Sequence, residues 1–480
     1  MLFMDSMIKF KYSVIVTTSN VVLGRQKTAL YQRKANERTW FSMFWQKDIE
    51  TMGRKKLEEL QLSRLKWIVN HCYQTVPLYR NKFDEAGFEP DKLKTLSDIQ
   101  YIPFTTKEDI RDTYPFGMFA SPMNKIVRIH ASSGTTGKPT VVGYTKNDLT
   151  NWSDLVARLC AAAGANEDDI VHIAFGYGLF TGALGLHYGL ERLGATIVPT
   201  SSGNTEKNLM LMKDFGATAL VSTPSYALYM SEIAREMGLK KDDFKMRLGL
   251  FGSEGCTPEM RDKIEEAWGL FATDNYGMSE LMGPGVSGEC EFRCGMHVAE
   301  DHFIPEIIDS KTGAVLGEGE VGELVITTIT KEGFPVLRYR TKDITRLNYD
   351  VCACGRTHVR MDKIMGRTDD MLKIRGVNVF PSQIESVLVS CPQVGGHYQL
   401  IVRSEGYMDT LEVKVELFDT SLLEKYSELE KLQRTINAKL KTVLGIDAKV
   451  SLTEPKSLER FQGKAKRVID LRNTKEDNHL

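Results

Sequence analysis

The 480-residue sequence has little net charge, few cysteines for its length and no long apolar run. With 62 Lys and Arg against 63 Asp and Glu, its composition gives no electrostatic reason to expect nucleic acid or a membrane surface as a partner. No apolar run approaches the ~20 residues that a membrane-spanning helix needs. Eight cysteines are too few for a dense disulfide framework, so we expect reduced thiols, including metal ligands, in a cytoplasmic protein.

A composition of 42% hydrophobic and 26% charged residues is typical of a globular protein, and the length suits two or three domains. Residues 1–40 differ from the rest, because they carry seven Lys and Arg against Asp5 and Glu37. We expect a poorly defined N-terminal extension here. A leader or anchor, an upstream-extended start and a weakly ordered tail are the three alternatives.

From Phe44 onward, apolar patterns predict alternating helices and strands. Residues 54–79 and 147–165 have helical spacing, and short apolar strands are expected at 170–175, 195–199, 219–223 and 247–252. This alternation predicts an α/β fold of helix-covered parallel sheets. Residues 301–347 instead predict a small antiparallel β unit.

A domain boundary is predicted near Gly366, which separates a large N-terminal domain (41–366) from a small C-terminal α+β domain (367–480). In the small domain, Ser382 and Glu385 have the spacing of a capping box at a helix start. Further elements expected there are strands at 371–375, 377–380, 411–417 and 448–452, and a long amphipathic helix near 421–443.

The segment Ser132–Pro139 (SSGTTGKP) combines hydroxyl side chains, glycines and a lysine, which suits it to bind a polyphosphate. Its flanks, 126–130 and 140–144, are rich in β-branched residues, so the loop is expected to join two strands. It does not fit the Walker A pattern, in which a strand leads into a helix and four residues separate the glycines. The alternative is an ordinary polar hairpin loop.

Four later segments could serve the same ligand. In Asp274–Glu280 (DNYGMSE), an aromatic ring can stack on a purine and Glu280 offers hard oxygens to Mg²⁺. In Arg338–Asp343, the terminal carboxylate can accept both ribose hydroxyls. The charged junction Gly366–Lys373 suits a hinge, and Gly463–Arg467 is a basic segment. Each segment alone is also compatible with a structural turn or a solvated surface.

The order and spacing of these segments resemble the adenylate-forming superfamily of acyl-CoA ligases, most closely the phenylacetate–coenzyme A ligases, over about residues 44–475. The most specific parts are Gly366–Met371 (GRTDDM), Arg375–Gln383 (RGVNVFPSQ) and Phe175–Gly182 (FGYGLFTG). The resemblance implies a large N-terminal domain, a mobile C-terminal lid, and ligation of an aryl-acetic acid to coenzyme A through an acyl-adenylate.

The resemblance also implies roles for individual residues. Thr136 and Lys464 would be catalytic, with Lys464 serving adenylation alone, Glu280 would hold Mg²⁺ and Asp369 would be the hinge. ATP would be bound by Ser132, Ser133, Gly134, Thr135, Gly137, Lys138, Gly252, Ser253, Glu254, Asn275, Tyr276, Gly277, Met278, Ser279, Asp343 and Arg367.

Three departures from the family pattern concern the nucleotide and acid sites. Lys342 stands where many superfamily members have Gly, and Gly255-Cys256 stands where these ligases often have Pro-Trp. Leu186 stands where phenylacetate enzymes resemble one another in having Ala. If the acid pocket is lined by Phe175, Tyr177, Phe180 and Leu186, the leucine narrows it; core packing is the alternative for all four.

Cys290, Cys294 and His297 fall within eight residues, and Cys352-Ala353-Cys354-Gly355 follows downstream. Thiolates and an imidazole at two separated turns suit tetrahedral Zn²⁺. Family members that resemble this chain pair a Cys and a Gly-x-His with Cys-x-Cys-Gly, which favours Cys290, His297, Cys352 and Cys354, with Cys294 as the alternative ligand. Buried free thiols are the alternative to a structural zinc.

We therefore expect an enzyme that uses ATP, Mg²⁺ and coenzyme A and contains a structural Zn²⁺. A homodimer is left open, as are the identity of the acid and the residues that bind coenzyme A. The rival hypotheses are an adenylate-forming enzyme with a different acid or a non-CoA acceptor, and a zinc-stabilised nucleotide-binding protein without chemistry.

Overall fold

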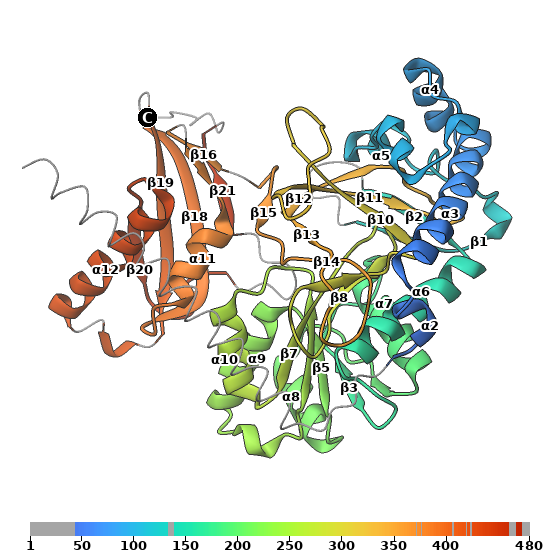
Figure 1. The fold of residues 1–480 in the computed structure, drawn as a ribbon. Helices are drawn as coiled ribbons and strands as arrows, with labels where there is room; N and C mark the ends of the chain where they lie inside the picture. Colours follow the sequence, from blue (N-terminus) through green and yellow to red (C-terminus); the bar gives the residue numbers. More distant parts are fainter. Residues whose placement is uncertain are drawn as a thin grey trace, which may run out of the picture.

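The computed structural model of the chain describes residues 44–132, 139–370, 372–375, 377–405, 408–418, 420–422, 425–459 and 467–472. The expected N-terminal extension, residues 133–138 of the loop and Lys464 lie outside the described residues. Figure 1 shows a large body with helices around its sheets and a smaller body beside it, which contains α11, α12 and the last strands. Within the described residues, no helix has the length and apolar character needed to cross a membrane.

A nine-stranded sheet of order β13-β14-β9-β8-β7-β6-β5-β3-β4 forms the centre of the large body. The five strands from β4 to β7 run parallel, as the alternating pattern predicts, and the other four are antiparallel to their neighbours. The strands are β3 (Ile170–Ile173), β4 (Thr196–Val198), β5 (Ala219–Ser222), β6 (Leu248–Gly252), β7 (Phe271–Met278), β8 (Gly283–Glu289), β9 (Met296–Val298), β13 (Leu347–Asn348) and β14 (Arg360–Met361).

Helices connect the parallel strands, as expected for right-handed crossovers. Several begin at a threonine whose hydroxyl accepts a bond from the first helical turn, for example Thr145 from Asp148 N (3.1 Å). The helices are α2 (Lys47–Glu50), α3 (Arg54–Thr75), α4 (Pro77–Ala86), α5 (Lys107–Asp112), α6 (Lys146–Ala162), α7 (Thr181–Leu193), α8 (Thr205–Asp214), α9 (Pro224–Glu236) and α10 (Pro258–Trp268).

The prediction of a single helix over residues 54–79 is wrong. It is broken at Val76, which is extended (φ −112°, ψ 109°), and Pro77 opens a second helix. Proline cannot continue a helix through its own nitrogen but suits the first helical position, so the break follows from that residue.

Two further sheets complete the large body. The antiparallel unit expected at 301–347 is confirmed by β10 (Phe303–Ile308), β11 (Gly322–Thr328) and β12 (Tyr339–Thr345), which β15 (Gly366–Arg367) extends. Strands β1 (Ile126–Ala131) and β2 (Val141–Thr145) pair antiparallel with Ala131 opposite Val141. The glycine- and serine-rich loop therefore joins two strands, as predicted.

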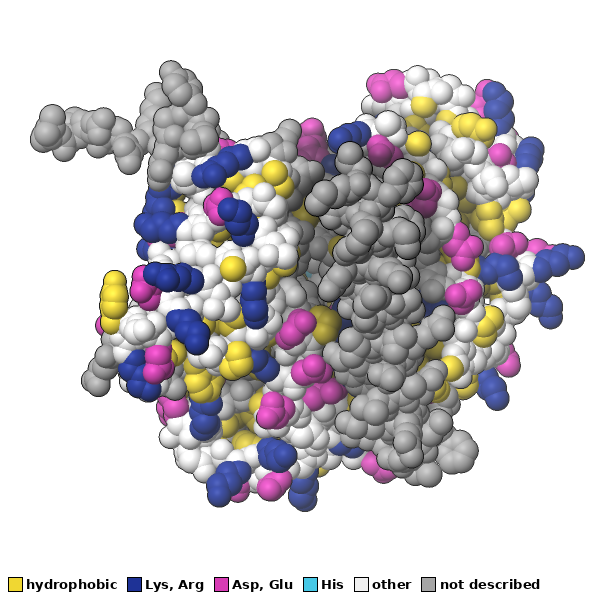
Figure 2. All heavy atoms as spheres, turned by 60° about the vertical axis from the view of Figure 1, so that its left-hand side comes forward, with side chains coloured by type: hydrophobic (Ala, Val, Ile, Leu, Met, Phe, Trp, Pro, Cys, Tyr) yellow, Lys and Arg dark blue, Asp and Glu magenta, His cyan; other side chains and the backbone are white. Residues whose placement is uncertain are grey.

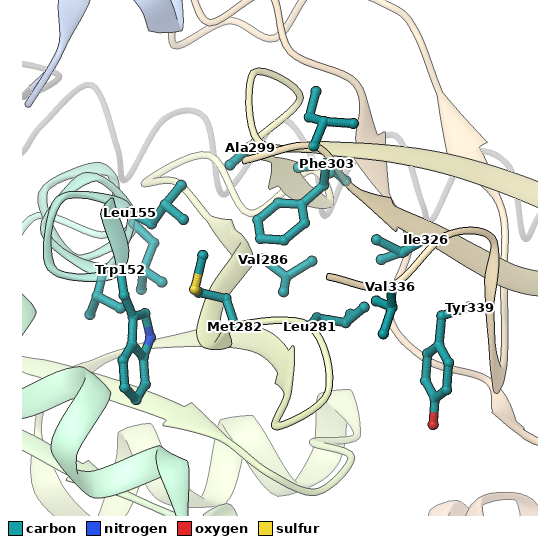
Figure 3. Packing of buried hydrophobic residues seen from close by; sticks show 14 of the residues in the cluster. Trp152, Leu155, Leu281, Met282, Val286, Ala299, Phe303, Ile326, Val336 and Tyr339 are labelled. Atoms are coloured by element: carbon teal, nitrogen blue, oxygen red, sulfur yellow. The ribbon is translucent and has the colours of Figure 1, made fainter. Parts of the chain in front are cut away.

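The main core lies between the sheets and α6. Figure 3 shows Trp152 and Leu155 of α6 facing Met282 and Val286, with Phe303 and Ile326 of the second sheet beyond them. Gly283 and Gly285 have positive φ (97° and 109°), and a Cβ at Gly283 would lie 2.6 Å from the Trp152 ring. The start of β8 thus approaches α6 so closely that only glycine fits there.

The small body has its own hydrophobic core, which includes Ile374, Ile384, Leu400, Val413 and Ile436. Its elements are the hairpin β16 (Leu372–Ile374) and β17 (Val377–Val379), the sheet β18 (Val394–Glu405), β19 (Met408–Leu417), β20 (Lys449–Thr453) and β21 (Val468–Asp470), and helices α11 (Pro381–Val389) and α12 (Tyr426–Leu444).

The capping box predicted from Ser382 and Glu385 is wrong. Helix α11 begins one residue earlier, at Pro381, and the Phe380 N–H donates to Gln383 Oε1 (3.0 Å). Ser382 Oγ donates to the Met365 carbonyl (2.8 Å), and the Glu385 carboxylate pairs with Arg467.

On the face seen in Figure 2, basic and acidic side chains are interspersed over the described residues.

Candidate active site

The base of the glycine- and serine-rich loop is held by Ser132. Its N–H donates to the Thr140 carbonyl (2.9 Å), and its hydroxyl accepts from Thr140 N (2.9 Å). These two bonds close the strand ends around the loop. Ser133, Gly134, Thr135, Thr136, Gly137 and Lys138 lie outside the described residues, so their assignment stays a prediction.

The segments expected to bind adenine meet at the carboxyl ends of the parallel strands β6 and β7, where ligand sites of open α/β sheets lie. Gly252 is directly opposite Asn275, whose side-chain amide donates to the Phe251 carbonyl (2.6 Å). A Cβ on Gly252 would lie 2.7 Å from the Asn275 carbonyl oxygen, and one on Gly277 would lie 1.9 Å from that of Gly283. Both glycines are therefore required by close backbone approach.

Glu254 follows Ser253, which has a positive φ of 73°. The Glu254 carboxylate accepts a bond from the Ser225 N–H at the start of α9 (2.7 Å). A helix N-terminus with a free N–H group favours a negative charge, so the start of α9 fixes this carboxylate beside the end of β6.

Asp343 on β12 is buried and bonded through both carboxylate oxygens. Oδ2 accepts from the Tyr276 hydroxyl (2.6 Å), and Oδ1 accepts from Arg367 Nη1 (2.7 Å). Burial raises the pKa of Asp343, and the nearby Arg367 cation opposes this. Because each carboxylate oxygen can accept a second bond, the arrangement orients Asp343 and still leaves it able to accept ribose hydroxyls.

Arg367 connects this carboxylate to the expected hinge. Its guanidinium also contacts both oxygens of Asp369 (2.8 and 2.9 Å), and β12 and β15 place Asp343 directly opposite Arg367. The neighbouring Lys342 has φ +67°, a conformation that glycine adopts without strain. Glycine at this position would therefore be free of strain.

Glu280 lies in the turn between β7 and β8, next to Met278 at the end of β7 and to Ser279, whose hydroxyl is 3.1 Å from that of Thr181. The Tyr339 hydroxyl is 3.4 Å from Glu280 Oε1, a long-range contact. A buried carboxylate of this kind has the hard oxygen donors that Mg²⁺ prefers.

Sequence reasoning did not identify Lys331, which is fully buried. Its Nζ donates to the Glu280 carbonyl (3.2 Å) and lies over the rings of Tyr144 (4.8 Å) and Phe334 (5.0 Å). Burial lowers the pKa of Lys331 to about 7, against the attraction of Asp148 and Glu280. The apolar pattern could not have revealed this, because the partners come from distant segments.

The four side chains expected around the acid occupy different environments. Phe175 and Leu186 belong to the main core, Tyr177 packs against that core, and Phe180 is 42% exposed. The Tyr177 hydroxyl lies 3.1 Å from His187 Nδ1, a contact that sequence reasoning missed. Their assignment to an acid pocket stays a prediction.

The structure brings Cys290, His297, Cys352 and Cys354 together, with potential ligand atoms all within 4.8 Å of one another. Cys290 Sγ is 3.7 Å from Cys352 Sγ, and Cys354 Sγ is 3.4 Å from His297 Nε2. Cys294, the alternative ligand, is exposed and donates to the Phe292 carbonyl (3.2 Å).

The thiols of Cys290, Cys352 and Cys354 shift one another's pKa. Thiol donors from Cys290 and Cys354 lower the pKa of Cys352, whereas its contact with Cys352 raises the pKa of Cys290. The neighbours therefore stabilise one thiolate at the expense of another. A divalent cation would stabilise all three thiolates, and three sulfurs with one imidazole are the donor set of a structural zinc site.

Comparison with known proteins gives two family models. One described as AMP-binding enzyme matches residues 58–330, and one described as AMP-binding enzyme C-terminal domain matches residues 376–472. The phenylacetate-coenzyme A ligase of Thermus thermophilus is 49% identical over 90% of this chain and 100% of that protein. The phenylacetate-coenzyme A ligase of Escherichia coli is 51% identical over 88% of this chain and 97% of that protein.

Among solved structures, 2-hydroxyisobutyryl-CoA ligase in the postadenylation state with R3-HIB-AMP has a TM-score of 0.84, at 31% identity over 89% of this chain and 92% of that one. The same ligase with 2-HIB-AMP and CoA in the thioesterification state has a TM-score of 0.66, at 32% identity and the same coverage. With a family model over more than half of its length and relatives about 50% identical over nearly nine-tenths of it, the chain belongs to the AMP-binding enzyme family and, within it, to the phenylacetate–coenzyme A ligase family.

Proposed function

We propose that the protein ligates an aryl-acetic acid, phenylacetate or a close relative, to coenzyme A and converts ATP to AMP and diphosphate. The main support is the set of Asp343, Tyr276 and Arg367, hydrogen-bonded beside the ends of β6 and β7. These three side chains suit the ribose and adenine of ATP. The identity of the acid is inferred from the relatives named as phenylacetate-coenzyme A ligases.

The reaction has two halves. A carboxylate oxygen of the acid attacks the α-phosphorus of ATP, the bond to the diphosphate oxygen breaks, and diphosphate leaves with the electron pair. The thiolate sulfur of coenzyme A then attacks the carbonyl carbon of the acyl-adenylate, and AMP leaves. The first half brings an anion to a polyanion, so it requires positive groups around the phosphates.

The chain has residues for each task. Thr136 and Lys464 would donate to the phosphates during adenylation, and the Ser132–Lys138 loop would hold the phosphate chain. Asp343 and Arg367 would bind the ribose. Glu280 would hold Mg²⁺, which neutralises phosphate charge when bound. Asp369 would be the hinge at which the small domain turns between the two halves.

We also propose that Cys290, His297, Cys352 and Cys354 hold a structural Zn²⁺. All four are buried, and the site lies at the edge of the nine-stranded sheet, where β8, β9 and the β13–β14 connection meet. A metal there would hold these segments together and would take no part in the chemistry.

The test is AMP release with and without coenzyme A across phenylacetate, 4-hydroxyphenylacetate, indoleacetate, benzoate and short aliphatic acids. We expect CoA-dependent release confined to arylacetates. Release that does not need coenzyme A would indicate an adenylate-forming enzyme with another acceptor.

In Lys464→Ala, we expect acid-dependent exchange of diphosphate into ATP to fall about 100-fold or more, with ATP binding largely retained. Unchanged exchange would refute the role of Lys464.

A further inference from the structure

The small domain contacts the large one at helices α9 and α10, and Val389 of α11 is buried with apolar residues of both helices. Lys456 pairs with Glu236 (2.8 Å), His397 Nε2 lies 3.6 Å from Glu232, and Arg235 lies over the Phe418 ring (4.7 Å). The first of these pairs is exposed on both sides, and exposed ion pairs contribute little free energy. In Figure 1 the small body stands beside α9 and α10.

Arg467, at the start of β21, makes a more buried connection. Its Nη1 donates to Glu385 of α11 and to the Tyr398 hydroxyl of β18 (2.9 Å), and its guanidinium lies over the Tyr398 ring (4.5 Å). Its Nη2 donates to Ser225 Oγ in the large domain (2.9 Å). One guanidinium therefore joins two elements of the small domain to the N-terminus of α9.

Ser225 continues this connection into the nucleotide site. Its N–H donates to Glu254 Oε1 (2.7 Å), and Glu254 belongs to the segment expected to bind adenine. The negative charge of Glu254 also attracts the Arg467 cation. Arg467, Ser225 and Glu254 thus form a continuous polar chain from the small domain to the end of β6.

The arrangement of the two domains matches one state of a relative better than another. Against 2-hydroxyisobutyryl-CoA ligase, the TM-score is 0.84 for the postadenylation state and 0.66 for the thioesterification state. Sequence identity and coverage are nearly the same in the two comparisons, so the difference in TM-score reflects a difference in structure between the two states. The Arg467 contacts belong to the arrangement that resembles the former state.

We infer that Arg467 is a positioning residue for the adenylation half-reaction, because it anchors the small domain to Ser225 and Glu254 beside the adenine segment. This inference rests on the proposed function. Arg467 also follows Lys464 closely in the sequence, so the anchor is near the lysine expected to serve adenylation. Thioester formation, which uses another domain arrangement, would not need the anchor.

The test measures the two half-reactions separately in Arg467→Met. Adenylation is followed by acid-dependent exchange of diphosphate into ATP, and thioester formation by the reaction of synthetic phenylacetyl-adenylate with coenzyme A. We expect exchange to fall about 10- to 100-fold, the range for loss of charge-assisted hydrogen bonds, and thioester formation to stay within about twofold.

Two further variants control for folding. Ser225→Ala removes the contact from the large-domain side without leaving Glu385 unpaired, and we expect a smaller loss, about threefold, again confined to exchange. Arg403→Met breaks a more exposed arginine–glutamate pair inside the small domain, with Glu412 (2.6 Å), and should leave the ratio of the two half-reactions unchanged.

Equal losses of both half-reactions in Arg467→Met and Ser225→Ala, or no loss of exchange in either, would refute the anchor while the unaltered enzyme remains active. An unaltered enzyme without acid-dependent exchange would refute the proposed function and this inference with it.

Discussion

The imidazole of His172 is fully buried in β3, with Nε2 2.7 Å from Asn208 Oδ1 and 2.9 Å from Thr200 Oγ1. Burial disfavours the charged ring and lowers the pKa of His172 from 6.5 to about 4, although the contact with Asn208 opposes this. The folded state therefore binds a proton less readily than the unfolded state does.

From this we predict an acid-sensitive contribution to stability. Because the folded pKa is depressed, the contribution is fully present above pH 6.5 and is lost as the pH falls through 4. A shift of this size corresponds to about 3 kcal/mol at most. In His172→Gln, we expect the fall in unfolding free energy between pH 7 and pH 4.5 to be smaller than in the unaltered protein by up to that amount. Identical pH dependence of the two proteins in denaturant titrations would contradict the assignment.

Individual residues also show which parts of the candidate site could be predicted from sequence and which could not. Gly252 and Gly277 lie in motifs that local spacing singles out, and the structure shows that close backbone approach requires glycine at both positions. The contacts of Lys331, Glu385 and Arg467 could not be predicted, because their partners are brought together by tertiary structure. A lysine before Glu-Gly resembles a surface turn, and nothing in its neighbourhood reveals the buried carboxylates that it faces.

At the scale of elements, the hairpin β7–β8 links the cluster of Cys290, His297, Cys352 and Cys354 to the segment expected to bind adenine. Cys290 directly follows β8, and its neighbour Glu289 accepts from the Asp274 N–H (2.9 Å) and pairs with Arg261 (2.6 Å). Asp274 precedes the adenine segment on β7. The cluster and the expected adenine segment are therefore connected through one hydrogen-bonded pair of strands.

We expect purified protein to contain close to one zinc per chain. Cys352→Ser should lose the metal, lower the melting temperature by about 5–10 °C and weaken ATP binding, because the edge of the sheet loses its crosslink. Cys294→Ser, which alters an exposed thiol outside the cluster, is the matched control and should change neither. Purified unaltered protein that contains no zinc and is fully stable, with a melting temperature that Cys352→Ser does not lower, would rule the site out; elemental analysis and thermal unfolding measure the two quantities.

Elements with strong local patterns were predictable: the strands around the loop, the parallel strands and the antiparallel unit. The β7–β8 hairpin was not, since its glycine-rich second strand has little β propensity and is held by packing against α6. The order of the strands in the central sheet could not be predicted either, because β9, β13 and β14 are two or three residues long and pair with strands that are distant in sequence.

At the scale of the whole molecule, the sequence indicates two domains but not their arrangement. Each body has a separate hydrophobic core, and cores follow from apolar patterns. The contacts between the bodies include polar side chains such as Ser225, Glu236 and Lys456, beside the apolar Val389 of α11, which is buried against α9 and α10. An interface of this kind suits domains that must separate and turn, because few buried apolar contacts have to be broken.

This predicts that fixing the interface separates the two half-reactions. The side chains of Glu236 and Lys456 meet at 2.8 Å, so cysteines at both positions can be joined by a short bifunctional maleimide. Crosslinked Glu236→Cys/Lys456→Cys should retain diphosphate exchange and lose thioester formation by about tenfold or more, because the small domain can no longer turn. Glu236→Cys alone, treated in the same way, controls for modification of native thiols. Full thioester formation by completely crosslinked protein would mean that both half-reactions proceed in the arrangement described here, and that the hinge at Asp369 is not used.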